Sequence, residues 1–64
     1  MNFRILVVDD DNLVAISLRK VLVRFGYETE TCIDASKIFD VVNQFQPDLI
    51  LLDIYLTTHD GLNV

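Results

Sequence analysis

The 64-residue sequence has few of the residues that build disulfide scaffolds, nucleic-acid interfaces or membrane spans. Its single cysteine, Cys32, excludes an internal disulfide and fits a reducing compartment, and we expect a small buried thiol there. The five Lys and Arg residues are scattered along a chain of net charge −5, which argues against nucleic acid as a partner. No apolar run approaches the ~20 residues of a membrane span, and the first residues lack a signal-peptide pattern. We therefore expect a soluble, cytoplasmic protein that binds no membrane.

The composition is that of a folded protein, with 52% hydrophobic and 23% charged residues. A chain of this length forms at most one domain, and it buries only about 60% of the surface that its unfolded form exposes. We therefore expect a single domain with little stability in reserve.

Two apolar runs that end at carboxylates are the most informative feature of the sequence. Residues 5–8 lead directly into Asp9, Asp10 and Asp11, and residues 49–52 lead directly into Asp53. Runs of this length that are rich in Val, Ile and Leu are typical of strands buried on both faces of a parallel sheet.

The remaining periodicities predict two helices and one further strand. We expect a strand over 4–8, a helix over 12–25 that Asp11 or Asn12 caps and Gly26 closes, and an alternating, half-exposed strand over 27–32. A second helix is predicted over 35–44, capped by Asp34 and ended before Pro47, followed by the strand over 49–52. The side chains predicted to face the core are Val14, Leu18, Val21, Leu22 and Phe25 from the first helix and Ile38, Phe39, Val42 and Phe45 from the second.

The element order β-α-β-α-β predicts an open α/β fold of parallel strands joined right-handedly. The most apolar strand, the first, belongs in the centre, and the polar second strand suits an edge, so we predict the order 2-1-3. Asp9, Asp10 and Asp53 then converge on one pocket at the carboxyl ends of neighbouring strands, where ligands bind in such sheets. Like charges this close repel, so either one carboxylate is protonated or a hard divalent cation such as Mg²⁺ lies among them.

Five short motifs resemble the receiver domain of response regulators. They are Val7-Val8-Asp9-Asp10, Gly26-Tyr27, Pro47-Asp48-Leu49, Leu52-Asp53-Ile54 and Asp60-Gly61, in the order and spacing of that family. The resemblance covers the whole chain but only the first half of the family's five-stranded flavodoxin-like fold. It implies a partial receiver domain over residues 1–64 with a truncated form of that fold.

The resemblance also implies a function and a role for each acidic residue. Asp53 matches the phospho-acceptor, which takes a phosphoryl group from a sensor histidine kinase, a phosphotransfer protein or a small phosphodonor. Asp10 matches the direct Mg²⁺ ligand, Asp9 the acid that acts through coordinated water, and Tyr55 a ligand through its backbone carbonyl. The implied protein is a phospho-acceptor module of two-component signalling and not an enzyme.

The chain also departs from the family pattern. Thr57 stands where Pro is usual, Ala35 where Gly is common, and Ile38 where a small residue is common. The Ser/Thr after the fourth strand and the Lys after the fifth, which contact the phosphoryl oxygens in relatives, have no counterpart in these 64 residues. We therefore expect this segment alone to be incomplete for switching.

Two other functions remain open. Asp9-x-Asp11 after an apolar strand resembles the nucleophile motif of haloacid-dehalogenase-type phosphatases, with Asp9 as nucleophile and Asp11 as general acid. Against this, Asp11 fits a helix cap better than a site acid, and the next core strand ends in Asp53, where that family has Ser or Thr. The second alternative is a non-catalytic half-receiver that serves assembly or interaction.

The strand over 49–52 also suggests self-association. In the order 2-1-3 it forms an edge, and an uncharged hydrophobic edge strand is a template for pairing with another chain. We therefore expect a homo-oligomer, most simply a two-fold dimer in which this strand pairs antiparallel with its mate.

Overall fold

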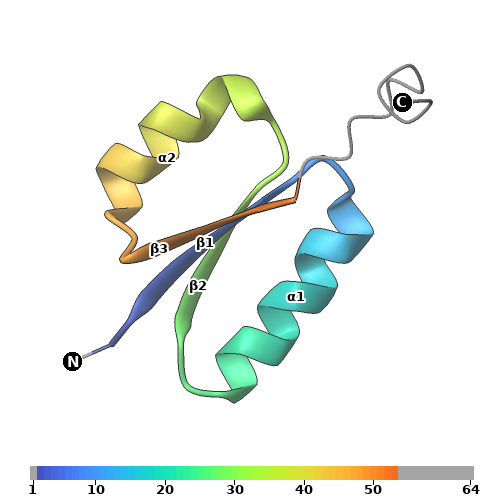
Figure 1. Ribbon diagram of the computed structural model, residues 1–64, viewed down its shortest axis with the longest axis vertical. Coiled ribbons are helices and arrows are strands. Elements are labelled where there is room, and N and C mark those ends of the chain that lie inside the picture. The colour runs from blue at the N-terminus through green and yellow to red at the C-terminus, as the bar shows by residue number, and fades with distance from the viewer. Residues whose placement is uncertain (1, 54–64) are drawn as a thin grey trace, which may run out of the picture.

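A computed structural model describes residues 2–53 as a three-stranded parallel sheet with a helix on each face (Figure 1). The elements are β1 (Arg4–Asp9), α1 (Asn12–Arg24), β2 (Glu28–Cys32), the 3₁₀ turn η1 (Ala35–Lys37), α2 (Ile38–Phe45) and β3 (Leu49–Asp53). The strand order is β2-β1-β3, and β1 pairs in parallel with both neighbours. The predicted fold class and strand order are confirmed.

The core consists of two apolar layers, one on each side of β1. Ile5 and Val7 face α1, where they pack with Ala15, Leu18 and Leu22. Leu6 and Val8 face the other helix, where Cys32, Ile38, Val41, Val42 and Phe45 surround them. Because β1 is covered on both faces and both edges, it is the best-buried strand, as its continuous apolar run predicts.

The ends of α1 are fixed by the residues that the sequence indicates. Asp11 is the N-cap, and its carboxylate accepts the backbone N–H groups of Leu13 and Val14. At the other end, Gly26 has a φ of +94° and donates its N–H to Val23, while the Tyr27 N–H bonds the carbonyl of Leu22. These paired bonds form a Schellman motif, which turns the chain sharply into β2.

The second helical segment differs in detail from the prediction of one helix over 35–44. It starts as the 3₁₀ turn η1, capped by Asp34, and becomes α-helical only over Ile38–Phe45. Its C-cap, Gln46, has a left-handed φ of 52° directly before Pro47, which cannot continue a helix. No helix within residues 2–53 is long and apolar enough to cross a membrane.

Three side chains predicted to face the core are exposed, so that part of the prediction is wrong. Phe25 and Phe39 are 74% and 81% exposed, and Val21 is exposed as well. Phe25 is the C-cap, where the backbone already leaves the helix, and Val21 and Phe39 lie at helix positions that no described residue covers. The small residue Ala15, which the periodicity did not single out, is fully buried against β1.

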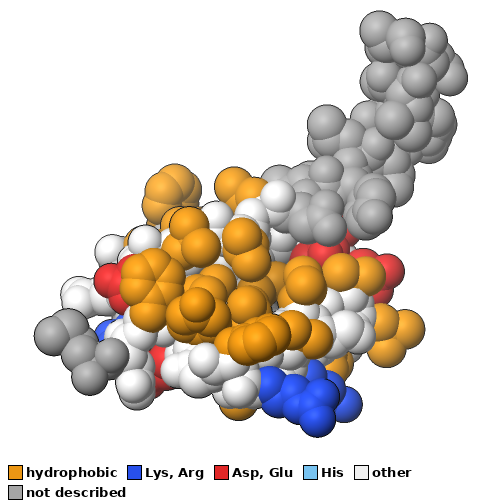
Figure 2. Space-filling model, turned by 60° about the horizontal axis from the view of Figure 1, so that its bottom comes forward, with side chains coloured by type: hydrophobic (Ala, Val, Ile, Leu, Met, Phe, Trp, Pro, Cys, Tyr) orange, Lys and Arg blue, Asp and Glu red, His pale blue; other side chains and the backbone are white. Residues whose placement is uncertain are grey.

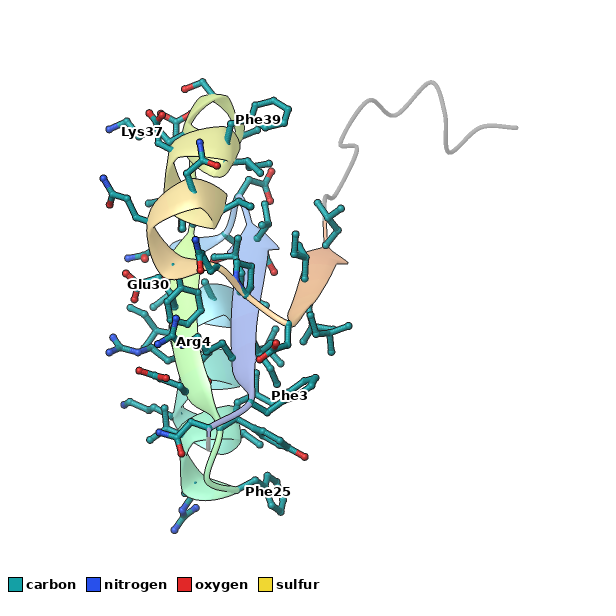
Figure 3. The ribbon with its side chains drawn as sticks, turned by 90° about the vertical axis from the view of Figure 1, so that its left-hand side faces the viewer. Phe3, Arg4, Phe25, Glu30, Lys37 and Phe39 are labelled. Atoms are coloured by element: carbon teal, nitrogen blue, oxygen red, sulfur yellow. The ribbon has the colours of Figure 1, made fainter. Side chains whose placement is uncertain are left out.

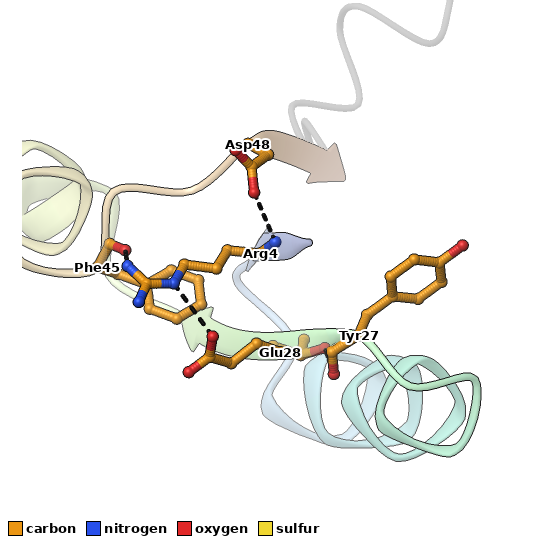
Figure 4. A network of polar contacts seen from close by, with 6 residues as sticks. Arg4, Tyr27, Glu28, Phe45 and Asp48 are labelled. Atoms are coloured by element: carbon orange, nitrogen blue, oxygen red, sulfur yellow. Dashed lines mark hydrogen bonds and ion pairs between the residues drawn. The ribbon is translucent and has the colours of Figure 1, made fainter. Parts of the chain in front are cut away.

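Arg4 holds the three strands together at their amino ends (Figure 4). Its backbone N–H donates to the Asp48 carboxylate at 2.8 Å, and the Asp48 N–H donates back to the Arg4 carbonyl at 2.7 Å. Its guanidinium donates to Glu28 on β2 and to the Phe45 carbonyl at the end of α2, and lies 5.8 Å from the Phe45 ring centroid. These contacts fix the start of β3 beside β1, and so determine which residues meet at the opposite end.

Candidate functional site at the carboxyl ends of β1 and β3

Asp9 is the last residue of β1 and its side chain is completely buried, at 0% exposure. In the parallel register of β1 and β3, Asp9 is the partner of Asp53, just as Val8 is the partner of Leu52. Neighbouring strands lie ~4.8 Å apart, and residues paired in register leave the sheet on the same face. The strand pairing therefore brings the backbones of these two acidic residues together at the carboxyl ends of the two strands.

The two carboxylate oxygens of Asp9 have different surroundings. Oδ1 accepts the backbone N–H of Asp11 at 2.9 Å, which fixes the side chain across the turn that leaves β1. Oδ2 is buried and has no hydrogen-bond partner among the described residues. Burying an oxygen of a carboxylate without a partner is costly, so this atom calls for a donor or a cation. The Asp11 N–H was not foreseen as a partner, although an Asp that bonds the N–H two residues on is a common turn.

The side chains of Asp10 and Asp11, the two residues after β1, have different roles. Asp10 lies directly after β1 and is exposed, so its carboxylate is available to solvent or to a ligand. The Asp11 carboxylate caps α1. The structure thus assigns Asp11 the predicted capping role, and a phosphatase motif that needs Asp11 as general acid is not favoured.

The remaining predicted site residues lie partly or wholly outside the described part of the chain. The backbone of Asp53 ends β3, but its side chain is not described, and Tyr55 lies beyond residue 53. Within residues 2–53, no three His, Cys, Asp or Glu side chains form a group that could hold a metal ion. Asp9 and Asp10 are thus the site carboxylates whose surroundings the structure describes.

Two further polar groups near the ends of the strands have structural roles. Cys32, at the end of β2, is buried against Leu6 and Val8 and donates its Sγ–H to the Asp34 carbonyl at 3.1 Å. Asp34 accepts the Ser36 hydroxyl at 2.7 Å and the Ser36 backbone N–H at 3.0 Å. These two bonds lower the pKa of the Asp34 carboxyl, the hydroxyl bond more than the backbone bond.

The carboxylate oxygens at the carboxyl ends of these strands fit a hard cation. The unpartnered Asp9 Oδ2 and the exposed Asp10 carboxylate are oxygen ligands of the kind that Mg²⁺ prefers. In open α/β sheets, ligands bind outside the carboxyl ends of the strands, which is the position of these acids. The hollow of about 510 Å³ lined by Ile16, Arg19, Lys20, Val23 and Arg24 lies along α1 and contains none of the site acids.

The parallel α/β sheet with acids at the ends of two adjacent strands agrees with the result of sequence comparison. Residues 5–64 match the response regulator receiver domain, and the chain belongs to this family. The chain is 42% identical over all 64 residues to the response regulator MprA of Mycobacterium tuberculosis (strain ATCC 25618 / H37Rv) and of Mycobacterium bovis (strain BCG / Pasteur 1173P2).

A relative with a different overall role shares the same segment. The chain is 46% identical over 59 residues to a protein-glutamate methylesterase/protein-glutamine glutaminase of Anaeromyxobacter dehalogenans (strain 2CP-C). The match covers 92% of this chain and 17% of that protein. The chain spans only 28% of the length of the MprA proteins. No solved structure matches the chain.

Proposed function

We propose that this chain is a phospho-acceptor module of two-component signalling, in which Asp53 receives a phosphoryl group from a sensor histidine kinase or a phosphotransfer protein. The observation that carries the proposal is the register pairing of Asp9 with Asp53, together with the unpartnered buried Oδ2 of Asp9. The module acts as a signalling element of the cytoplasm and not as an enzyme in its own right. The methylesterase relative indicates that such a segment also occurs in enzymes.

The chemistry follows from the residue types at this edge. An oxygen of the Asp53 carboxylate forms a bond to phosphorus while the bond from phosphorus to the donor's imidazole nitrogen breaks, and that nitrogen keeps the electron pair. Both partners are anionic, so the reaction needs positive charge between them. Mg²⁺ held by these acids would supply this charge.

Each residue of the proposed metal set has its own part. Asp10 would hold the metal directly from the exposed side, and Asp9, whose Oδ1 accepts the Asp11 N–H, would contribute through its unpartnered Oδ2. Asp53 and the backbone carbonyl of Tyr55 complete the set. Because residues that contact the phosphoryl group in relatives have no counterpart in the 64 residues, we expect weak Mg²⁺ binding by this chain alone.

A magnesium titration tests the metal set. Adding Mg²⁺ to the isotope-labelled 64-residue chain should shift the backbone amide signals of Asp9, Asp10, Asp53 and Tyr55 together, with one apparent affinity. Asp10→Asn should weaken that affinity at least tenfold, whereas the matched change Asp40→Asn, on the exposed side of α2, should leave it unchanged. Independent or absent responses at the four positions would contradict the proposed site.

Phosphorylation is tested separately from metal binding. In a protein with the full length of the relatives, acetyl phosphate should label Asp53, and Asp53→Asn should abolish acid-labile incorporation. The 64-residue chain should give little or no stable phospho-aspartate. Robust labelling of the short chain would show that the missing Ser/Thr and Lys matter less than we propose.

A further inference from the structure

Asp11 joins the site to the first turn of α1. Its backbone N–H donates to Oδ1 of Asp9 at 2.9 Å. Its carboxylate accepts the N–H of Leu13 at 3.0 Å and that of Val14 at 3.4 Å. Its carbonyl accepts the N–H of Ala15 at 3.0 Å. A single residue therefore links a site carboxylate to three N–H groups at the start of the helix.

The orientation of the Asp9 side chain depends on this link. Asp9 is completely buried, and the Asp11 N–H is the one donor that its carboxylate has among the described residues. Without that donor both oxygens would be buried and unpartnered, which is costly for a carboxylate. The side chain would then rotate about χ1 toward solvent or toward another donor. The Asp11 N–H thus keeps Oδ2 in the position where it is free for a ligand.

The Asp11 N–H is itself held in place by the cap. Asp11 has the extended backbone of an N-cap, with φ −96° and ψ 110°, and its side chain ties that backbone to the helix. The helix in turn is fixed on the sheet by Ala15, which is fully buried against β1. Removing the Asp11 side chain would leave the turn between β1 and α1 held more loosely, and with it the N–H that Asp9 accepts.

We propose that Asp11 is a positioning residue for Asp9: by capping α1, it holds the N–H that orients the Asp9 carboxylate toward a divalent cation. The effect on metal binding rests on the proposed function, whereas the orientation of Asp9 is a property of the chain without metal. The coupling is reciprocal, because a cation that prefers the oriented Asp9 also stabilises the capped turn.

Charge and capping have to be separated, because Asp11 lies at an acidic end of the molecule. Asp10 and Asp11 are exposed, and the one ion pair within residues 2–53, between Arg4 and Glu28, lies at the amino ends of β1 and β2. On the face shown in Figure 2, uncharged atoms separate the acidic side chains at the right (red) from the group of Lys and Arg side chains below them (blue). Replacing Asp11 therefore removes a negative charge as well as a cap.

Asp34 provides the matched control. Like Asp11 it is exposed and caps a helical segment through its carboxylate, but it has no hydrogen bond with Asp9. It caps η1, whose last residue, Lys37, lies at the end of the molecule toward which the β1 arrow points, opposite Phe3 (Figure 3). Asp34→Ala thus removes a cap and a charge at the same end of the sheet.

The Asp9 rotamer, measured without metal, tests the positioning role directly. Three-bond NMR couplings should give one χ1 rotamer for Asp9 in the unmodified chain, in Asp34→Ala and in Asp11→Ser, since Ser is also a preferred N-cap. Asp11→Ala should give averaged couplings. If Asp11→Ala does not fold, Asp11→Gly takes its place, because Gly removes the side chain at a smaller cost to the helix. A single Asp9 rotamer in the folded variant without a cap would overturn the proposal, whatever the chain does with magnesium. Averaging in Asp11→Ser or in Asp34→Ala would overturn it too.

A magnesium titration then measures the consequence for the site. The affinity for Mg²⁺, followed at the amide signals of Asp10 and Asp53, should fall about tenfold in Asp11→Ala, the lower end of the range for partners that orient metal ligands. Asp11→Ser and Asp34→Ala should bind Mg²⁺ nearly as well as the unmodified chain. Equal losses in Asp11→Ser and Asp11→Ala would overturn the proposal, because Asp11 would then act through its charge or as a ligand. If the unmodified chain does not respond to Mg²⁺, the proposed metal set fails, and the Asp9 couplings still decide the positioning role.

Discussion

At the scale of single residues, the carboxylates near the ends of the strands differ in whether an oxygen without a protein partner is exposed to solvent or buried. Asp11 and Asp34 cap helical segments, and each of their bonding oxygens has local donors. Asp9 is the exception, because one oxygen is bonded and the other is buried without a partner among the described residues. A polar atom left in this state is typical of a site that is completed by a ligand.

The Asp34 cap makes a prediction about pH. The Ser36 bonds lower the folded-state pKa of Asp34 below the ordinary 3.8, so the cap contributes stability above that value and loses it as the pH falls through the lowered pKa. A carboxyl NMR titration should place the Asp34 midpoint below 3.8, and Ser36→Ala should raise it, since the stronger of the two bonds is lost. Ser17→Ala, on distant α1, should leave the midpoint in place, and an unchanged midpoint in Ser36→Ala would contradict the role of the Ser36 hydroxyl.

At the scale of elements, the sequence predicted the order of strands and helices well, and the orientation of side chains at the helix ends less well. Gly26, Asp11 and Pro47 determine where helices begin and end through local chemistry, and local chemistry is visible in a sequence. Exposure of Phe25 and Phe39 depends on how far the sheet extends beneath each helix, which periodicity cannot report. For the site, spacing indicated that Asp9 and Asp53 meet, but not which Asp9 oxygen is held by the Asp11 N–H.

The two left-handed residues at the helix ends predict opposite effects of substitution. Gly26→Ala should destabilise the domain by about 1–2 kcal/mol, because an added Cβ is disfavoured at a φ of +94° although no atom lies within 4 Å of it. Gln46→Gly should be neutral or stabilise by up to about 1 kcal/mol, since Gln46 already bears that strain at a φ of 52°. Urea unfolding of both variants at one protein concentration measures the difference, and a stabilising Gly26→Ala would refute the assignment.

At the scale of the whole molecule, β1 is the best-buried strand among residues 2–53. Leu6 and Val7 are fully buried, whereas many of the apolar residues of α1, α2 and β3 are half exposed. A domain of this length is typically stable by about 3–10 kcal/mol, at ~0.05–0.15 kcal/mol per residue. The fold therefore depends mainly on the packing of apolar side chains around β1.

This dependence predicts that shortening a buried side chain on the central strand β1 strongly destabilises the molecule. Leu6→Ala removes a fully buried side chain between α2 and the sheet, and such changes cost about 2–5 kcal/mol, a large part of the total. We expect loss of the cooperative thermal transition, or a midpoint lowered by at least 10 °C, since a domain this small shifts by roughly 4–8 °C per kcal/mol. Leu13→Ala, at a position that is 74% exposed on α1, is the matched control and should shift the midpoint by only a few degrees. If the two variants melted alike, the core would not lie on β1, and the site acids at its end would lack the rigid support that the proposed function requires.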